Sequence, residues 1–269
     1  MIRRSLSPMH EMLSGIVCAK DARRLNEIVN HASVLPWVKG SLDGPLDLSV
    51  PVADRRNVTL LGEHGAVLFH WHQPGLYEAH TQVLPEGRGG WTLSFVRAAL
   101  HWLFTRTEAT EILTKCPRGN VAAKALARSI HGAFDFTNHH GWFRDGILIP
   151  TDIYSLKVQD WVRQAPGLVE RGRWFHERLE EEFALHAIQE PPHPDDEAHD
   201  RYVGAACEML LGGQPEKGVA FYNRWAVMAG YEQVKIVMND PLTVDIKTAV
   251  IRVSERDFSL LASEEMSCR

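Results

Sequence analysis

Cysteine is scarce in this sequence, and its distribution excludes one common kind of metal site. The four cysteines, Cys18, Cys116, Cys207 and Cys268, are far apart, and no two of them form a CxxC pair. A zinc site built on cysteines is therefore not expected, and free thiols in a reducing compartment are the simplest interpretation. Cys116 ends an apolar segment and is expected to pack in the core.

Membrane-spanning and nucleic-acid-binding signals are also missing. No apolar run approaches the roughly 18–20 residues that a membrane span needs, and the N-terminus lacks the apolar core of a signal peptide. The net charge is −5, and no basic block is longer than Arg3-Arg4. We therefore expect neither a membrane nor a nucleic acid among the partners.

Helices and strands alternate through the first part of the chain. Apolar side chains recur with helical spacing over residues 19–32, and extended segments follow at 46–52, 58–61 and 66–71. Strands that alternate with helices predict a mixed α/β sheet with a crossover connection.

The central unit of the sequence, residues 77–136, organises the rest. It predicts a strand at 77–84, a glycine-rich turn at 85–90, an amphipathic helix, a strand at 111–116 and a second helix from Asn120 to about Gly132. Extended segments follow at Phe134 and Phe136 and within 147–161, with a hairpin loop expected at 139–142.

The composition changes near Pro166-Gly167, where we expect a domain boundary. Charged helical segments follow at 168–188, 198–211 and 216–230, with a proline-rich loop at 189–196 and half-buried strands at 234–238 and 249–253. The predicted domains are therefore residues 1–160 and a smaller α+β module at 161–269.

Two patterns in the central unit resemble the GNAT acetyltransferase fold. The first is a strand, then Pro85-Glu86-Gly87-Arg88-Gly89-Gly90, then a helix; the second is Asn120, Ala123 and Leu126, followed by Gly132 and Phe134. In GNAT enzymes the turn and the helix N-terminus bind the pyrophosphate of acetyl-CoA. The resemblance implies a GNAT-like mixed sheet with flanking helices, plus the smaller C-terminal α+β module.

The resemblance also implies site residues. If acetyl-CoA binds, its contacts are expected at Val83, Leu84, Arg88, Gly89, Gly90 and Asn120, with backbone donors near Val83 and Leu84 for the oxyanion. A carboxylate or histidine on the central strands would take the proton from an amine, and the candidates are Glu78 and His80.

Two departures from the family pattern argue against catalysis. Where the family has further glycines, this chain has Trp91 and Leu93, whose bulk is expected to occupy the diphosphate position. The family's tyrosine, often the acid that protonates the leaving thiolate, is replaced by Ala127. The sequence therefore favours a degenerate GNAT protein that has no cofactor.

A closer resemblance is to GNAT-like proteins of tailed phages, related to a podovirus head-assembly protein. It covers mainly residues 75–136 and includes Thr105-Arg106-Thr107, 111–115, Pro117 and Asn120. It implies a non-catalytic structural or assembly protein of the virion head or head–tail region, present in the virion or in the host cytoplasm during assembly. Its partners would be other phage structural proteins or further copies of itself. The alternative is an acetyl-CoA-dependent N-acyltransferase.

Histidine is abundant, with 14 residues, and two groups invite other interpretations. His70, His72 and His80, with Glu78 or Glu63, could form a catalytic base, a metal site or an ordinary strand surface. The string 193–197, His-Pro-Asp-Asp-Glu, matches zinc-dependent deacetylases, but a helix cap explains its acidic residues more simply. No metal is therefore predicted.

Overall fold

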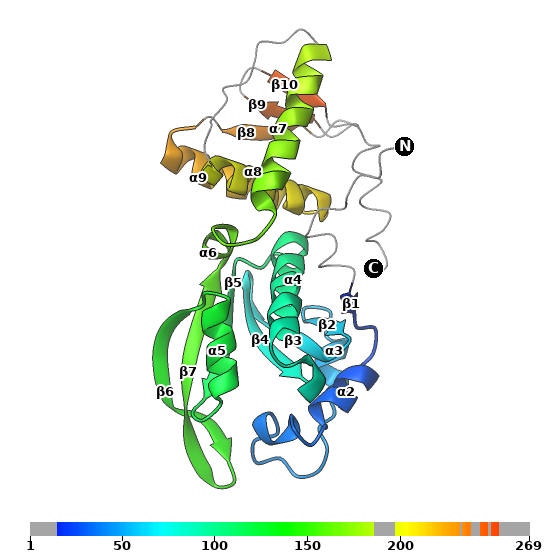
Figure 1. Cartoon of the computed structure of the whole chain (residues 1–269), viewed down its shortest axis with the longest axis vertical. Helices are drawn as coiled ribbons and strands as arrows, with labels where there is room; N and C mark the ends of the chain where they lie inside the picture. The colour runs from blue at the N-terminus through cyan, green and yellow to red at the C-terminus, as the bar shows by residue number, and fades with distance from the viewer. Residues whose placement is uncertain (1–14, 186–196, 232, 238–242, 247–248, 253–269) are drawn as a thin grey trace. The chain divides into compact units, whose positions relative to one another are not determined.

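The computed structural model describes residues 15–185, 197–231, 233–237, 243–246 and 249–252 (Figure 1). The chain divides into two compact units. Unit 1 consists of Met1–Leu103 and Glu108–Trp161, and unit 2 consists of Phe104–Thr107 and Val162–Arg269.

Unit 1 is built on a seven-stranded sheet with the strand order β1-β2-β3-β4-β5-β7-β6. The strands are β1 (Val17–Cys18), β2 (Val58–Gly62), β3 (Gly65–Gln73), β4 (Leu76–Val83), β5 (Glu111–Pro117), β6 (Ala133–Arg144) and β7 (Ile147–Lys157). Neighbouring strands are antiparallel except β4 and β5, which are parallel. A parallel pair needs a crossover, and the long helix α4 (Gly90–Arg106) supplies it.

Helices cover both faces of this sheet (Figure 1). The other helices in this part of the chain are α2 (Arg23–Val29), η1 (Leu35–Trp37), α3 (Ser49–Ala53), η2 (Pro85–Gly87), α5 (Val121–Ser129) and α6 (Val158–Val162). Helix α2 buries Leu25, Ile28 and Val29 against Ala66 of β3. Helix α5 buries Ala127 against Cys116 and Tyr154, so Cys116 is a core residue, as predicted.

The predicted strand at 46–52 is wrong, because residues Ser49–Ala53 form helix α3. The backbone N–H groups of Leu46 and Leu48 donate to the side chains of Asn30 (2.6 Å) and Asn26 (2.9 Å). The backbone N–H groups of this segment therefore donate to side chains of α2 and of its C-cap, and they do not need the carbonyl groups of a neighbouring strand.

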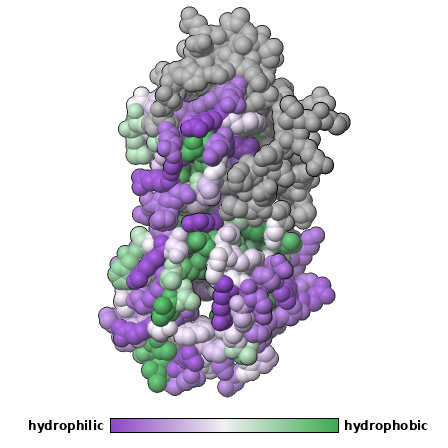
Figure 2. All heavy atoms as spheres, viewed as in Figure 1, coloured by the Kyte–Doolittle hydropathy of each residue, from purple (hydrophilic) through white to green (hydrophobic). Residues whose placement is uncertain are grey.

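The predicted hairpin loop at 139–142 is also wrong, because these residues lie inside β6. The pairing of β6 with β7 is irregular between Asn138 and Trp142, so the segment is a bulge within the strand. The turn between the two strands is Asp145-Gly146, where both residues have positive φ (50° and 80°). Exposed apolar side chains gather on this β6–β7 hairpin, among them Phe136, Phe143 and Ile147 (Figure 2).

Unit 2 combines helices with a small antiparallel sheet. It contains α7 (Leu168–Leu185), α8 (Glu197–Leu211), α9 (Pro215–Ala229) and an antiparallel sheet in the order β10-β9-β8, formed by β8 (Val234–Val237), β9 (Thr243–Ile246) and β10 (Ala249–Arg252). Strand β9 was not predicted. Most of the string 193–197 lies outside the described residues, and its last residue, Glu197, begins α8. Among the described helices, none has the length and apolar character needed to cross a bilayer.

Candidate active site

A gap in the sheet of unit 1 forms the candidate site. Strands β4 and β5 are paired only at Leu76–Glu111, Tyr77–Ile112 and Glu78–Leu113, and beyond these residues they separate. Each strand stays paired with its other neighbour, β4 with β3 and β5 with β7. The separation is therefore an opening inside the sheet. A cavity of about 1280 Å³ occupies it, and the surface of unit 1 is hollowed there (Figure 2).

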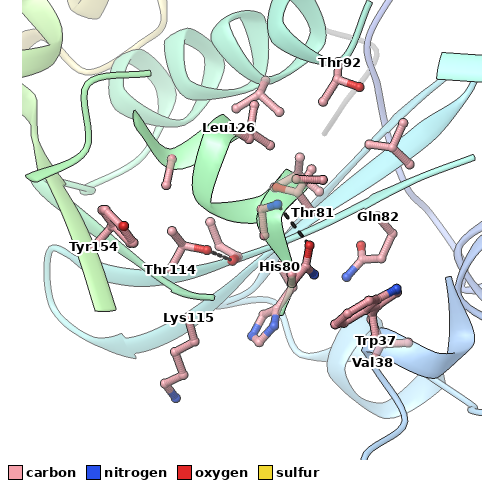
Figure 3. A pocket seen from close by; sticks show the side chains of 18 of the residues that line it. Trp37, Val38, His80, Thr81, Gln82, Thr92, Thr114, Lys115, Leu126 and Tyr154 are labelled. Atoms are coloured by element: carbon pink, nitrogen blue, oxygen red, sulfur yellow. Dashed lines mark hydrogen bonds between the residues drawn. The ribbon is translucent and has the colours of Figure 1, made fainter. Parts of the chain in front are cut away.

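The cavity reaches both faces of the sheet. Side chains alternate along a strand, so Glu78, His80 and Gln82 of β4 lie on one face, while Thr81 and Val83 lie on the other. Residues of both sets line the cavity. Figure 3 shows this arrangement, with His80 and Lys115 directed to one side of the strands and Thr92 and Leu126 on the other.

Glu78 lies at the point where the two strands separate, and three basic side chains surround it. Its Oε2 accepts a hydrogen bond from Lys115 Nζ (2.8 Å) and lies 2.9 Å from His72 Nε2, while Oε1 lies 3.5 Å from His80 Nε2. Burial alone would raise the pKa of Glu78, but His80, Lys115 and His72 together outweigh it and lower the pKa below its ordinary value. Glu78 is therefore an ionised carboxylate at neutral pH.

His80, the other candidate for the base, lies beside Glu78. Its imidazole is more exposed than the Glu78 side chain (43% against 7%). Desolvation within the cavity lowers the pKa of His80, and the opposite effect of the Glu78 carboxylate is smaller. His80 is thus neutral at neutral pH and has a ring nitrogen that can accept a proton. Glu63 does not join this group and lies beside His64 instead.

The N-terminus of α4 forms one rim of the cavity. Arg88, Gly89 and Gly90 line the cavity together with Thr92 and Leu93. Gly89 has φ +105°, and no atom lies within 4 Å of a Cβ added at Gly89 or Gly90, so the backbone is open there. The first N–H groups of a helix have no partner within the helix and carry partial positive charge. With the Arg88 guanidinium, they form a site suited to an anion.

Trp91 does not fill the cavity, so that prediction is wrong. Its ring stacks on Phe95 and contacts the edge of His64. A Cβ added at Gly62, Gly65 or Gly87 would lie 3.0–3.3 Å from the Trp91 ring or closer. Three glycines thus form the surface against which the indole packs, and Trp91 is absent from the cavity lining. Of the two bulky residues, only Leu93 borders the cavity.

Two of the predicted cofactor contacts have structural roles. The Leu84 N–H donates to the His64 carbonyl (2.8 Å), and Leu84 does not line the cavity. Asn120 borders the cavity, but its side chain caps α5 by accepting from the Ala123 N–H (3.0 Å). Backbone donors toward the cavity come instead from the other edge of β4. Thr114 Oγ1 of β5 donates to the Ala79 carbonyl (3.1 Å), so the backbone groups of Ala79 point toward β5. Backbone groups of every second residue of a strand point to the same side, so those of Thr81 and Val83 point into the gap as well.

Two functional candidates were not predicted from the sequence. Tyr154 of β7 lines the cavity beside Ala127, the position where the family has its tyrosine. Its ring makes an edge contact with Phe134, and Figure 3 shows it next to Thr114. Gln82 is buried, and within the described part of the chain its Oε1 has no hydrogen-bond donor. Buried acceptors normally have a donor, so a water molecule or a ligand group is expected to donate to this oxygen.

Comparisons with known proteins found similarity to solved structures. No protein-family model matches this sequence, and no curated protein matches it significantly. One similar solved structure is a spermidine N-acetyltransferase from Vibrio cholerae in complex with CoA and spermine. The two chains are 14% identical and superpose with a TM-score of 0.48, and the match covers 55% of this chain and 99% of that one. Another is the RimL ribosomal L7/L12 alpha-N-protein acetyltransferase in complex with coenzyme A. It is 16% identical to this chain, the TM-score is 0.45, and the match covers 55% of this chain and 96% of that one. The predicted fold class, including the smaller C-terminal α+β module, is confirmed.

The interpretation as a non-catalytic phage structural protein is wrong. The two similar structures are described as acetyltransferases in complex with coenzyme A. The part of the physical argument that rested on Trp91 also fails, because its indole packs on Phe95 and does not line the cavity.

Proposed function

We propose that unit 1 is an acyl-CoA-dependent N-acyltransferase. The observation that carries the proposal is the gap between β4 and β5, with the ionised Glu78 at its apex. A binding cavity that combines a few converging polar groups with titratable groups of shifted pKa is the usual form of an active site.

The cavity has the groups that an acyl-CoA requires. The diphosphate is an anion and would bind at the α4 N-terminus with Arg88, where Gly89 and Gly90 leave the backbone accessible. The pantetheine arm carries amide groups, which would pair with the free backbone edge of Thr81 and Val83. The unsatisfied Oε1 of Gln82 is suited to an N–H group of the amine or of the arm.

The residues on the two faces of the sheet suit the two proton transfers of the reaction. Acyl-CoA supplies a thioester carbonyl carbon, to which the amine nitrogen bonds as the carbon–sulfur bond breaks. Glu78, with the neutral His80 beside it, accepts the proton that the amine loses. The Tyr154 hydroxyl is placed to donate a proton to the departing thiolate, because it lies on the opposite face, beside Ala127.

The proposal is tested by following thiol release from acetyl-CoA in the presence of a panel of primary amines. Glu78→Gln keeps the shape of the side chain and one acceptor oxygen but removes its charge and its basicity. We expect it to lower kcat/KM by a factor of about 100 or more, the usual scale for a lost general base. Glu27→Gln, an exposed carboxylate paired with Arg24, is the matched control and should have no effect. Equal rates for the wild-type and Glu78→Gln proteins would contradict the role of Glu78.

A further inference from the structure

Two helices of unit 2 cross with their backbones in contact. A Cβ added at Gly172 of α7 would overlap the backbone of Asp200, and a Cβ added at Gly204 of α8 would overlap the carbonyl oxygen of Leu168. Only glycine permits so close an approach. His176 lies one turn after Gly172, and Asp200 lies one turn before Gly204. The glycine contact therefore holds these two side chains face to face.

A third side chain completes the group. His176 Nδ1 lies 3.2 Å from Asp200 Oδ1, and His199 Nδ1 lies 4.0 Å from the same oxygen. The two imidazoles stack, with ring centroids 4.8 Å apart and an interplanar angle of 20°. One nitrogen of each histidine and one Asp200 oxygen lie within 4.8 Å of one another. All three side chains are largely buried, with exposed fractions of 18%, 6% and 11% for His176, His199 and Asp200.

The surroundings of His199 suit a ligand role. Its Nε2 lies 3.2 Å from the hydroxyl of Tyr222, and the rings of Trp225 and Tyr231 enclose it. When that hydroxyl accepts the Nε2 proton, the lone pair of the ring is on Nδ1, toward Asp200. Histidines that bind metals are commonly held by such an outer hydrogen bond.

A cationic side chain, that of Arg173, also contacts the Asp200 carboxylate. Arg173 Nε lies 3.4 Å from Asp200 Oδ2, and the Arg173 side chain is 65% exposed. This contact involves the other carboxylate oxygen, so Oδ1 can act as a single ligand. A bare ion-pair cluster of His176, Arg173 and Asp200 would explain those contacts. It does not explain why a second, buried imidazole stacks on the first with its Nδ1 near the same oxygen.

We propose that His176, His199 and Asp200 bind one divalent transition-metal ion of the Zn²⁺ class. Two imidazole nitrogens and one carboxylate oxygen are ligands that Zn²⁺ prefers, and three protein ligands leave a fourth position for water. Bond lengths of about 2.0–2.2 Å place tetrahedral ligands roughly 3.3–3.5 Å apart. The ligand atoms lie within 4.8 Å of one another, so binding requires the site to contract. An imidazole binds a metal in the plane of its ring, so one of the two stacked rings must also turn. The ion would join α7 to α8 and stabilise unit 2. This site is independent of the proposed acyl transfer.

The test uses the full chain, stripped with a chelator and titrated with Zn²⁺ alone by calorimetry, and with Co²⁺ by visible absorption. We expect one site with micromolar or tighter affinity, a higher melting temperature, and the d–d bands of tetrahedral Co²⁺. His176→Gln and Asp200→Asn should each weaken binding at least about tenfold, because even outer-shell changes cost 10–100-fold. His139→Gln, which changes an exposed histidine of β6, is the matched control.

Circular dichroism of each variant shows whether it has folded, and His176→Gln is the variant best suited to this check because His176 is the least buried ligand. Absence of Zn²⁺ and Co²⁺ binding by the wild-type protein would overturn the proposal. So would binding that is unchanged in a folded His176→Gln variant, since the ion would then lie on other histidines.

Discussion

Trp91 stacks on Phe95 one turn further along α4, with ring centroids 4.8 Å apart and an interplanar angle of 13°. The indole therefore packs on glycines of the β2–β3 hairpin and of η2, whereas Leu93 borders the cavity. The two residues that suggested a closed cavity thus have different surroundings, and their substitutions should have different effects.

We expect Leu93→Trp to weaken CoA binding by about tenfold or more, because the added bulk would enter the cavity and displace well-packed ligand contacts. Trp91→Phe should leave the CoA affinity within about twofold and lower only the free energy of unfolding, by roughly 1–2 kcal/mol, as a partial loss of buried ring surface does. Calorimetry with CoA and denaturant unfolding of both variants measure these effects. Tighter CoA binding by Trp91→Phe would show that the indole does obstruct the site.

Lys115→Met tests the electrostatics of Glu78. Lys115 helps to lower the pKa of that carboxyl, so its loss should raise the pKa and move the acid limb of the kcat/KM profile to higher pH. The same pKa affects stability. A carboxyl whose folded-state pKa is lowered stabilises the fold above its unfolded pKa, and this contribution is lost as the pH falls through the folded value. The free energy of unfolding of the variant should therefore fall at neutral pH, and it should fall by a smaller amount at low pH. An unshifted acid limb would mean that Glu78 is not the base.

Tyr154→Phe tests the thiolate acid. Removing the hydroxyl should lower kcat by about 100-fold, the lower end of the usual range for a lost general acid, while the affinity for CoA stays nearly constant. An acyl donor with a more acidic thiol needs no protonation as it leaves, so it should restore most of the rate. A packing defect would lower the rate with both donors equally, and that result would exclude the role.

The elements around the site were predictable because their signals are local. Strand β4, the turn at Pro85, helix α4 and strand β5 all lie near their predicted positions, since alternation and helical spacing are read within a few residues. The Asp145-Gly146 turn also has a local signal, but the prediction placed the loop at the histidines before it.

The features that decide function were not predictable because they are long-range. The direction of the Trp91 indole depends on glycines at positions 62 and 65, which belong to a different hairpin. Tyr154 is placed beside Ala127 by the pairing of β7 with β5, and no local pattern fixes that register. The contact of His176 with Asp200 depends on two helices crossing at glycines.

The proposed acyl-CoA site is tested by calorimetric titration of the purified chain with acetyl-CoA, alongside Arg88→Gln and the matched exposed variant Arg56→Gln. Arg56 is paired with Asp54, so its variant should bind like the wild type. We expect one site with micromolar affinity in the wild type and about tenfold weaker binding in Arg88→Gln, the scale of a lost charge-assisted hydrogen bond. Absence of binding at millimolar acetyl-CoA would contradict the proposal.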